Sequence, residues 1–224
     1  MARRLVTVSD SKSIISEQFR TIRTNISFSL PDRDLKTILI TSSTPGEGKS
    51  TNAANLGVVF AHEGKRVLIV DADMRKPTLH YTFALFNTVG LSTLLSRQSE
   101  FQQAFQETPI VGLYVLTSGP IPPNPAELLA SKTFDVLLRE MQNHFDIIIF
   151  DAPPLLSVSD AQLLAHKSDG TLLIVHSGVA EKEDVLKAKA ILTSSKAKIL
   201  GVVLNNYKMP KKSKYYYEYF KTSV

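Results

Sequence analysis

The chain has 224 residues, 43% of them hydrophobic, which is enough to bury the core of one α/β domain but not of two large ones. It contains no cysteine, which excludes disulfides, thiolate metal sites and thiol nucleophiles and fits a reducing compartment. The longest apolar runs, such as residues 147–150, fall far short of the roughly 20 residues that cross a bilayer. No signal-peptide core follows the first four residues, so we expect a soluble, cytoplasmic protein.

The net charge of +5 is concentrated at the carboxyl end. Residues 208–224 hold five lysines and one acid, Glu218, or +4, whereas residues 1–207 hold 21 basic and 20 acidic side chains. A nearly neutral body argues against a nucleic-acid-binding surface over the whole domain, and no nucleic-acid partner is expected. We predict one folded domain, residues 1–207, followed by a flexible basic tail, residues 208–224.

The first predicted element is an amphipathic helix over about residues 13–28. Its apolar stripe is formed by Ile15, Phe19, Ile22 and Ile26, at spacings that recur on one helix face. Its polar face holds Glu17, Arg20 and Arg23, three residues apart. Taken alone, such a face predicts an ordinary solvated helix with weak ion pairing.

A phosphate-binding loop follows the next predicted strand, residues 37–41, and leads into a helix over residues 51–62. A strand, a glycine-rich turn and a helix N-terminus aim backbone N–H groups at a phosphate, with Lys49 reaching the β and γ phosphates and Ser50 ligating Mg²⁺. The pattern would place glycine at position 43, where this chain has Ser43. We predict that the chain binds ATP or GTP through Pro45, Gly46, Glu47, Gly48, Lys49, Ser50 and Thr51.

Two later strands, residues 66–70 and 146–150, each end in aspartate. Asp71 and Asp73 follow the first, and Asp151 follows the second. A strand-ending aspartate by itself only begins a turn, but ligands of parallel sheets collect at the carboxyl edge, so these carboxylates should converge with Lys49. We predict a catalytic site of Lys49, Asp71, Asp73 and Asp151. Mg²⁺ would be held by Ser50, Asp71 and Asp151, and Asp71 would also orient or deprotonate an incoming hydroxyl group.

Two cations, Arg75 and Lys76, come directly after these aspartates. They could steer phosphate or an acidic partner, or they could be plain surface residues. Further along the chain, Asn205 could contact adenine or serve a turn.

The remaining elements complete an α/β pattern. Predicted strands cover residues 113–117, 171–176 and 199–204, and predicted helices cover 126–142 and 181–194. Asn124 and Pro125 give the first of these helices a clear start signal. Strands that alternate with helices predict a mostly parallel sheet with helices on both faces.

Four tyrosines gather in the tail, at Tyr215, Tyr216, Tyr217 and Tyr219. Interleaved with lysines, they could form a disordered adhesive tail or a base-stacking arm. Beside a phosphate-transfer site they could also be phosphate acceptors.

With these motifs together, residues 12–219 resemble the bacterial tyrosine kinases, the P-loop family that regulates capsular and exopolysaccharide synthesis, in the cytoplasmic form of Gram-positive bacteria. Residues 45–51 look like the Walker A motif, 71–77 like Walker A′ and 150–154 like Walker B. Residues 117–129 also look like a family segment, and the tyrosine cluster completes the match. The resemblance implies a P-loop fold of the MinD and ParA branch and an ATP-dependent protein-tyrosine kinase that phosphorylates its own tail between subunits.

The resemblance also implies partners. Glu17, Arg20 and Arg23 match the oligomerisation motif of a ring-like homo-oligomer. A transmembrane polysaccharide co-polymerase would activate the kinase through its cytoplasmic tail and recruit it to the inner face of the membrane, a phosphatase would reverse the reaction, and other proteins could be substrates. The alternative is a MinD- or ParA-like positioning or partitioning ATPase. Those carry a signature lysine at the position of Thr44, and its absence argues against their roles.

Overall fold

The computed structural model describes residues 4–29 and 35–208. Its strands are β1 (Thr37–Ser42), β2 (Val67–Asp71), β3 (Phe105–Glu107), β4 (Leu113–Leu116), β5 (Ile147–Asp151), β6 (Gly170–His176) and β7 (Ile199–Asn205). They form one seven-stranded sheet in the order β3-β4-β2-β5-β1-β6-β7. Every neighbouring pair is parallel except β3 with β4. The predicted mostly parallel sheet is therefore confirmed. The predicted phosphorylation sites, Tyr215, Tyr216, Tyr217 and Tyr219, lie outside the described residues.

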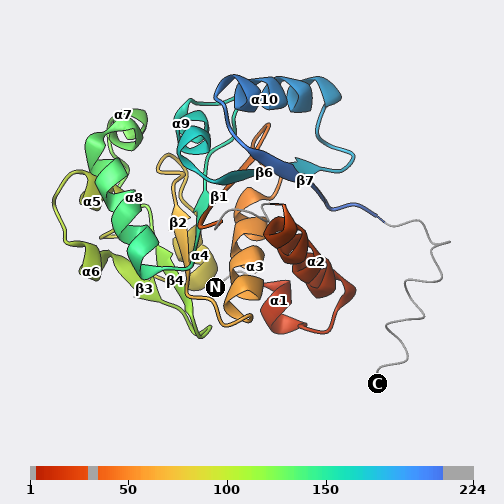
Figure 1. Cartoon of the computed structure of the whole chain (residues 1–224), viewed down its shortest axis with the longest axis horizontal. Coiled ribbons are helices and arrows are strands. Elements are labelled where there is room, and N and C mark those ends of the chain that lie inside the picture. Colours follow the sequence, from red (N-terminus) through yellow and green to blue (C-terminus); the bar gives the residue numbers. More distant parts are fainter. Residues whose placement is uncertain (1–3, 30–34, 209–224) are drawn as a thin grey trace.

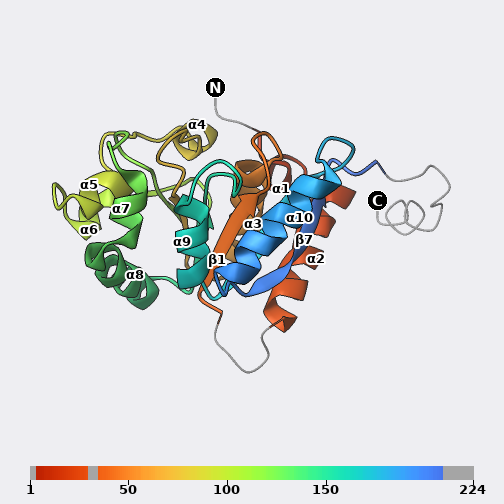
Figure 2. The same ribbon diagram turned by 90° about the horizontal axis from the view of Figure 1, so that it is seen from above.

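Helices cover both faces of this sheet, as Figures 1 and 2 show. One face shares an apolar cluster with α1 (Val6–Ser9), α2 (Ile14–Phe28), α3 (Lys49–Ala61) and α4 (Leu79–Phe83). The other face shares a cluster with α5 (Leu91–Leu95), α6 (Phe101–Ala104), α7 (Pro125–Ala130), α8 (Lys132–His144), α9 (Asp160–Lys167) and α10 (Lys182–Ser194). The central strands β1, β2 and β5 are therefore buried along their whole length, which explains their continuous apolar sequences.

The predicted helix over residues 126–142 is wrong as a single element. It is divided into α7 and α8 at Ser131, whose extended backbone (ψ 155°) interrupts the helix. The Ser131 hydroxyl accepts a hydrogen bond from the Phe134 N–H at 3.2 Å and so caps α8. Pro125 occupies the first position of α7 as expected, but the Asn124 side chain bonds Glu127 instead of capping the backbone.

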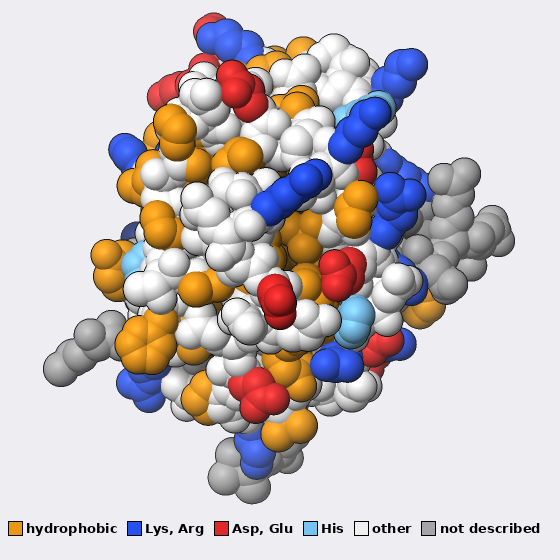
Figure 3. All heavy atoms as spheres, turned by 90° about the vertical axis from the view of Figure 1, so that its left-hand side faces the viewer, with side chains coloured by type: hydrophobic (Ala, Val, Ile, Leu, Met, Phe, Trp, Pro, Cys, Tyr) orange, Lys and Arg blue, Asp and Glu red, His pale blue; other side chains and the backbone are white. Residues whose placement is uncertain are grey.

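The end of the molecule that carries α5 to α8 mixes all classes of side chain. Figure 3 shows apolar groups on this face interspersed with acidic, basic and uncharged polar groups. This face has charges of both signs and no single basic field.

Candidate functional site

The phosphate loop, residues 43–48, connects the end of β1 to the start of α3. Gly46 and Gly48 adopt left-handed backbone conformations, with φ of +85° and +95°. Two features disfavour a side chain at Gly48. Its backbone φ is positive, and an added Cβ would lie 2.1 Å from Nδ2 of Asn205. The loop thus delivers the N-terminus of α3, with Lys49 and Ser50 in its first turn, to the carboxyl edge of the sheet.

Inside the loop lies the carboxylate of Glu47, which is 1% exposed. Its Oε1 accepts hydrogen bonds from the Ser43 hydroxyl, from the Thr44 N–H at 2.7 Å and from the Thr44 hydroxyl at 3.1 Å. Its Oε2 accepts from the backbone N–H of His176, the last residue of β6, at 3.0 Å. Glu47 was predicted among the nucleotide-binding residues, and the structure uses its side chain to bond the protein itself.

Two asparagines fasten the same loop from outside. Asn205, the last residue of β7, donates from Nδ2 to the Glu47 carbonyl oxygen at 2.9 Å. Asn52 of α3 donates from Nδ2 to the Gly48 carbonyl oxygen at 2.9 Å. For Asn205, a contact to adenine and a turn role were considered, and the structure shows a third role, a hydrogen bond that holds the phosphate loop.

The predicted carboxylates meet beside the loop. Asp71 ends β2 and Asp151 ends β5, and the two are direct neighbours in the register of these strands, both fully buried. Oδ2 of Asp71 accepts from the N–H groups of Thr78 and Leu79, at 3.0 and 2.9 Å. Burial, and then the charge of Asp151, raise the pKa of the Asp71 carboxyl well above its ordinary value.

Lys49 contacts this cluster through Asp73. Its Nζ lies 3.7 Å from Oδ2 of Asp73, and Oδ1 of Asp73 accepts from the Lys76 N–H at 3.1 Å. The structure therefore brings together Lys49, Asp71, Asp73 and Asp151, the four residues predicted as catalytic. Of the other predicted loop residues, Ser50 is partly exposed, and Pro45 and Thr51 are exposed beside it.

This cluster suits a magnesium–nucleotide complex. Oδ1 of Asp71 is buried and makes no hydrogen bond with any described residue, which leaves a carboxylate oxygen available to a cation or a hydroxyl group. No group of three or more His, Cys, Asp or Glu side chains within residues 4–29 and 35–208 is arranged to hold a metal by itself. Mg²⁺ is usually bound by one or two carboxylates together with the phosphates of its substrate, and Asp71 offers a carboxylate oxygen of this kind.

Arg75 has a defined partner that the sequence did not reveal. Its Nε and Nη2 donate to Oδ2 and Oδ1 of Asp160, at 2.9 and 3.1 Å. Asp160 is fully buried at the start of α9, just after the loop that follows Asp151. The ion pair therefore joins the segment after β2 to the segment after β5. The hydrogen bonds that Arg75 donates to Asp160 raise the pKa of Arg75. The neighbouring Lys76 is exposed.

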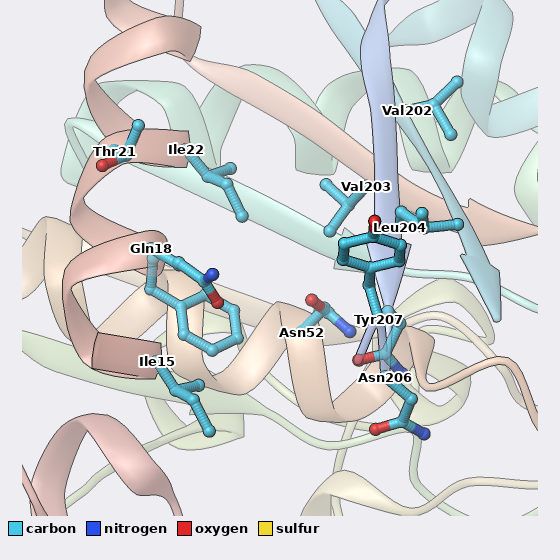
Figure 4. Close-up of a pocket in the computed structure, with 12 residues that line it drawn as sticks. Ile15, Gln18, Thr21, Ile22, Asn52, Val202, Val203, Leu204, Asn206 and Tyr207 are labelled. Atoms are coloured by element: carbon cyan, nitrogen blue, oxygen red, sulfur yellow. The ribbon is translucent and has the colours of Figure 1, made fainter. Parts of the chain in front are cut away.

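A cavity of about 410 Å³ opens between α2 and β7 beside the phosphate loop. Figure 4 shows Ile15, Gln18 and Ile22 of α2 on one side of it and Val203 and Leu204 of β7 on the other. Asn52 lies between the two sides. Asn206 and Tyr207, which follow β7, also line the cavity. The cavity is lined by both asparagines that hold the loop.

The predicted polar face of α2 is partly engaged within this chain. Glu17 and Arg20 form an ion pair, and Arg20 also donates to the Ser11 carbonyl oxygen. Arg23 donates from Nη1 to the Val59 carbonyl oxygen of α3 at 3.2 Å, and its Nε lies 3.7 Å from Glu63. Arg23 therefore helps to hold α2 against α3.

Comparison with known proteins identifies the family. A family model described as an AAA domain matches residues 35–180. The tyrosine-protein kinase YwqD of Bacillus subtilis is 52% identical over 217 residues, or 97% of this chain and 92% of YwqD. The putative tyrosine-protein kinase CapB of Staphylococcus aureus is 45% identical over 208 residues, or 93% of this chain and 91% of CapB. The chain belongs to the bacterial tyrosine kinases.

Solved structures agree with this assignment. The chimerical protein CapA2B2 matches this bacterial tyrosine kinase with a TM-score of 0.88 and 46% identity, over 94% of this chain and 93% of the chimera. The kinase domain of Escherichia coli ETK matches with a TM-score of 0.90 and 30% identity, over 95% and 83%. MinD of Pyrococcus horikoshii, complexed with Mg-ADP, is 23% identical with a TM-score of 0.66, over 80% and 75%. This last likeness concerns the fold alone, and that fold is the one that the sequence predicted.

Proposed function

We propose that this chain is an ATP-dependent protein-tyrosine kinase that phosphorylates the tyrosines of its own tail between subunits. One observation carries the proposal: Lys49, Asp73 and the buried pair Asp71 and Asp151 lie together at the mouth of a formed phosphate loop. Its family membership supports tyrosine as the acceptor. The tail supplies four candidates, Tyr215, Tyr216, Tyr217 and Tyr219.

In this proposal the phosphate loop holds ATP. The N–H groups of residues 45–51 and the ammonium group of Lys49 bind the β and γ phosphates and neutralise the charge that develops during transfer. Lys49 would then exchange its contact with Asp73 for the phosphates. Ser50, Asp71 and Asp151 would hold Mg²⁺, which when bound polarises the transferred phosphoryl group.

The transfer itself joins the tyrosine oxygen to the γ phosphorus as the bond from that phosphorus to the β–γ bridging oxygen breaks. ADP leaves with the bridging oxygen, and the phenolic proton passes to a base. We assign this role to Asp71, because its carboxylate ends β2 two residues before Asp73, which Lys49 contacts. Its Oδ1 is the oxygen not engaged by the N–H groups of Thr78 and Leu79.

We further propose that the active form is a ring-like homo-oligomer built through Glu17, Arg20 and Arg23. The name of the CapA2B2 chimera supports a partner of the CapA kind, and we infer activation by the cytoplasmic tail of a transmembrane polysaccharide co-polymerase. This partner would bring the kinase to the inner face of the membrane, where it regulates capsular or exopolysaccharide synthesis, and a phosphatase would reverse the modification. No helix among residues 4–29 and 35–208 is long and apolar enough to cross a membrane.

Phosphorylation would also release the tail. Each phosphotyrosine adds about −1.5 to −2 charges, so four add roughly −6 to −8 to a segment that now carries +4. The sign of the tail inverts, which should weaken its docking on a neighbour and loosen the oligomer. Sedimentation of the phosphorylated protein beside Lys49→Met tests this idea, and equal oligomer sizes would contradict it.

The decisive experiment is to incubate the full chain with Mg-ATP and an activating co-polymerase tail, then locate phosphate by peptide mass spectrometry. We expect phosphate on the tail tyrosines of the wild type and none in Lys49→Met. Hydrolysis of ATP without labelling, unchanged by Tyr→Phe at all four tail positions, would favour the MinD- or ParA-like ATPase instead.

A further inference from the structure

Glu47 is a buried anion inside a loop that binds anions. A carboxylate that pointed at the phosphates would repel them, but this one is turned inward and is 1% exposed. Its two oxygens accept four hydrogen bonds, from Ser43, Thr44 and His176. Hydrogen bonds to an ionised acceptor are about twice as strong as neutral ones, so this set fixes the side chain firmly.

These contacts connect three parts of the chain. The carboxylate joins the first residues of the loop to the end of β6, through the His176 N–H. The carbonyl oxygen of the same residue accepts from Asn205 at the end of β7, at 2.9 Å. Glu47 is therefore the residue at which the loop is fastened to both outer strands on that side of the sheet.

Ser43 makes sense in the same arrangement. The usual pattern has glycine at this position, and here the buried Ser43 hydroxyl donates to the Glu47 carboxylate. Ser43 and Glu47 thus form a matched pair, in which the hydroxyl group supplies one of the donors that the buried carboxylate needs.

We propose that Glu47 is a positioning residue for the nucleotide, and that Ser43 completes its hydrogen-bond set. By fastening the loop to β6 and β7, Glu47 holds the N–H groups of the loop in the orientation that the phosphates require, while its side chain does not contact the phosphates. This inference rests on one part of the proposed function, that the phosphate loop binds a nucleotide. It does not require that the chain phosphorylates tyrosine.

Calorimetric titration with Mg-ADP tests this role without any phosphoryl transfer. Glu47→Gln keeps the shape of the side chain but turns an NH₂ group toward groups that are themselves donors. We expect its Kd for Mg-ADP to rise by about tenfold or more, and that of Ser43→Ala by about three- to fivefold. Glu107→Gln removes an exposed acid on β3, at the opposite edge of the sheet, and should leave the Kd unchanged.

Three further readouts distinguish the proposed positioning role of Glu47 from a merely structural one. Thermal unfolding of each variant shows whether it is folded at the titration temperature, and Ser43→Ala still tests the pair if Glu47→Gln is not. Because the two residues act through one contact, the double variant should bind about as weakly as Glu47→Gln alone. In kinetics, the KM for ATP should rise while kcat stays within about threefold, because the Glu47 side chain orients the loop for the bound nucleotide and does not touch the transferred phosphoryl group.

The inference is overturned if folded Glu47→Gln binds Mg-ADP as the wild type does, or if the losses from the two single variants simply add. It stays testable if no tyrosine is ever labelled, because Mg-ADP binding does not depend on the acceptor. A chain that binds Mg-ADP with the expected losses but phosphorylates nothing would refute the proposed kinase activity and leave this inference standing.

Discussion

The two halves of the candidate site are held in opposite ways. In the phosphate loop, each oxygen of the buried Glu47 carboxylate accepts hydrogen bonds from the protein, so the loop is formed by the chain's own contacts. In the carboxylate cluster, Asp71 and Asp151 lie side by side and fully buried, at an electrostatic cost that shows in the raised pKa of Asp71. The nucleotide half is preorganised. In the chemical half, burial first and the charge of Asp151 second disfavour the ionised form of Asp71, and a cation or a proton relieves that cost.

Lys49→Met should have the largest effect, because Lys49 links the two halves. We expect tail phosphorylation to fall by at least about 1000-fold, since the variant loses both the charge on the phosphates and the contact to Asp73. Initial rates of phosphotyrosine formation measure this. Residual activity within tenfold of the wild type would mean that neither half of the site needs the lysine.

Asp71→Asn separates catalysis from stability. Loss of the proposed base should lower the rate by about 100- to 10,000-fold. The raised pKa means that the native state binds the Asp71 proton more tightly than the unfolded chain does. The stability that this proton contributes is complete below the unfolded pKa of about 3.9 and is lost as the pH rises through the native pKa.

The neutral amide of Asp71→Asn avoids that loss. Without nucleotide and magnesium, its unfolding temperature should therefore exceed that of the wild type near neutral pH, and the difference should shrink as the pH falls toward about 4. Calorimetry across this range measures the effect. A variant that is less stable than the wild type at neutral pH would show that the carboxylate cluster carries no electrostatic cost.

Gly48→Ala tests the preorganised half directly. The added methyl group meets Asn205 Nδ2 at 2.1 Å, and the backbone φ of +95° disfavours any side chain. We expect Mg-ADP binding to weaken by about tenfold or more, because Asn205 must move and release the Glu47 carbonyl oxygen. Adding Asn205→Ala removes the clash but restores neither the backbone conformation nor the hydrogen bond to the Glu47 carbonyl oxygen, so the double variant should bind Mg-ADP no better than Gly48→Ala.

Arg75→Met should have the smallest effect that can still be measured. It leaves the buried Asp160 without its two bonds from the guanidinium group, and we expect a loss of about 1–3 kcal/mol in the free energy of unfolding. Lys76→Met, at the exposed neighbouring position, should change it by less than about 0.5 kcal/mol. Chemical denaturation of both variants measures this contrast, and equal losses would mean that the ion pair contributes nothing.

Much of this site could be predicted because its signals are local. A buried strand followed by a glycine-rich turn, or by an aspartate, can be recognised within about ten residues of sequence. The convergence of Lys49, Asp71 and Asp151 then follows from the geometry of parallel sheets. The pairing of Arg75 with Asp160 could not be predicted, because it joins residues 85 positions apart that share no pattern. The break at Ser131 and the short antiparallel strand β3 were not predicted either. The spacing of apolar residues in the sequence gives no signal at either place.

The order of the central strands has a consequence for how the protein folds. β1 and β2, which carry the phosphate loop and Asp71, do not pair with each other, because β5 lies between them and pairs with both. Since β5 comes much later in the chain, a ribosome releases the loop and the first aspartates well before the strand that aligns them. Closing this sheet is a long-range step of the kind that slows folding. A nascent chain therefore acquires its assembled site only after most of the protein has been synthesised.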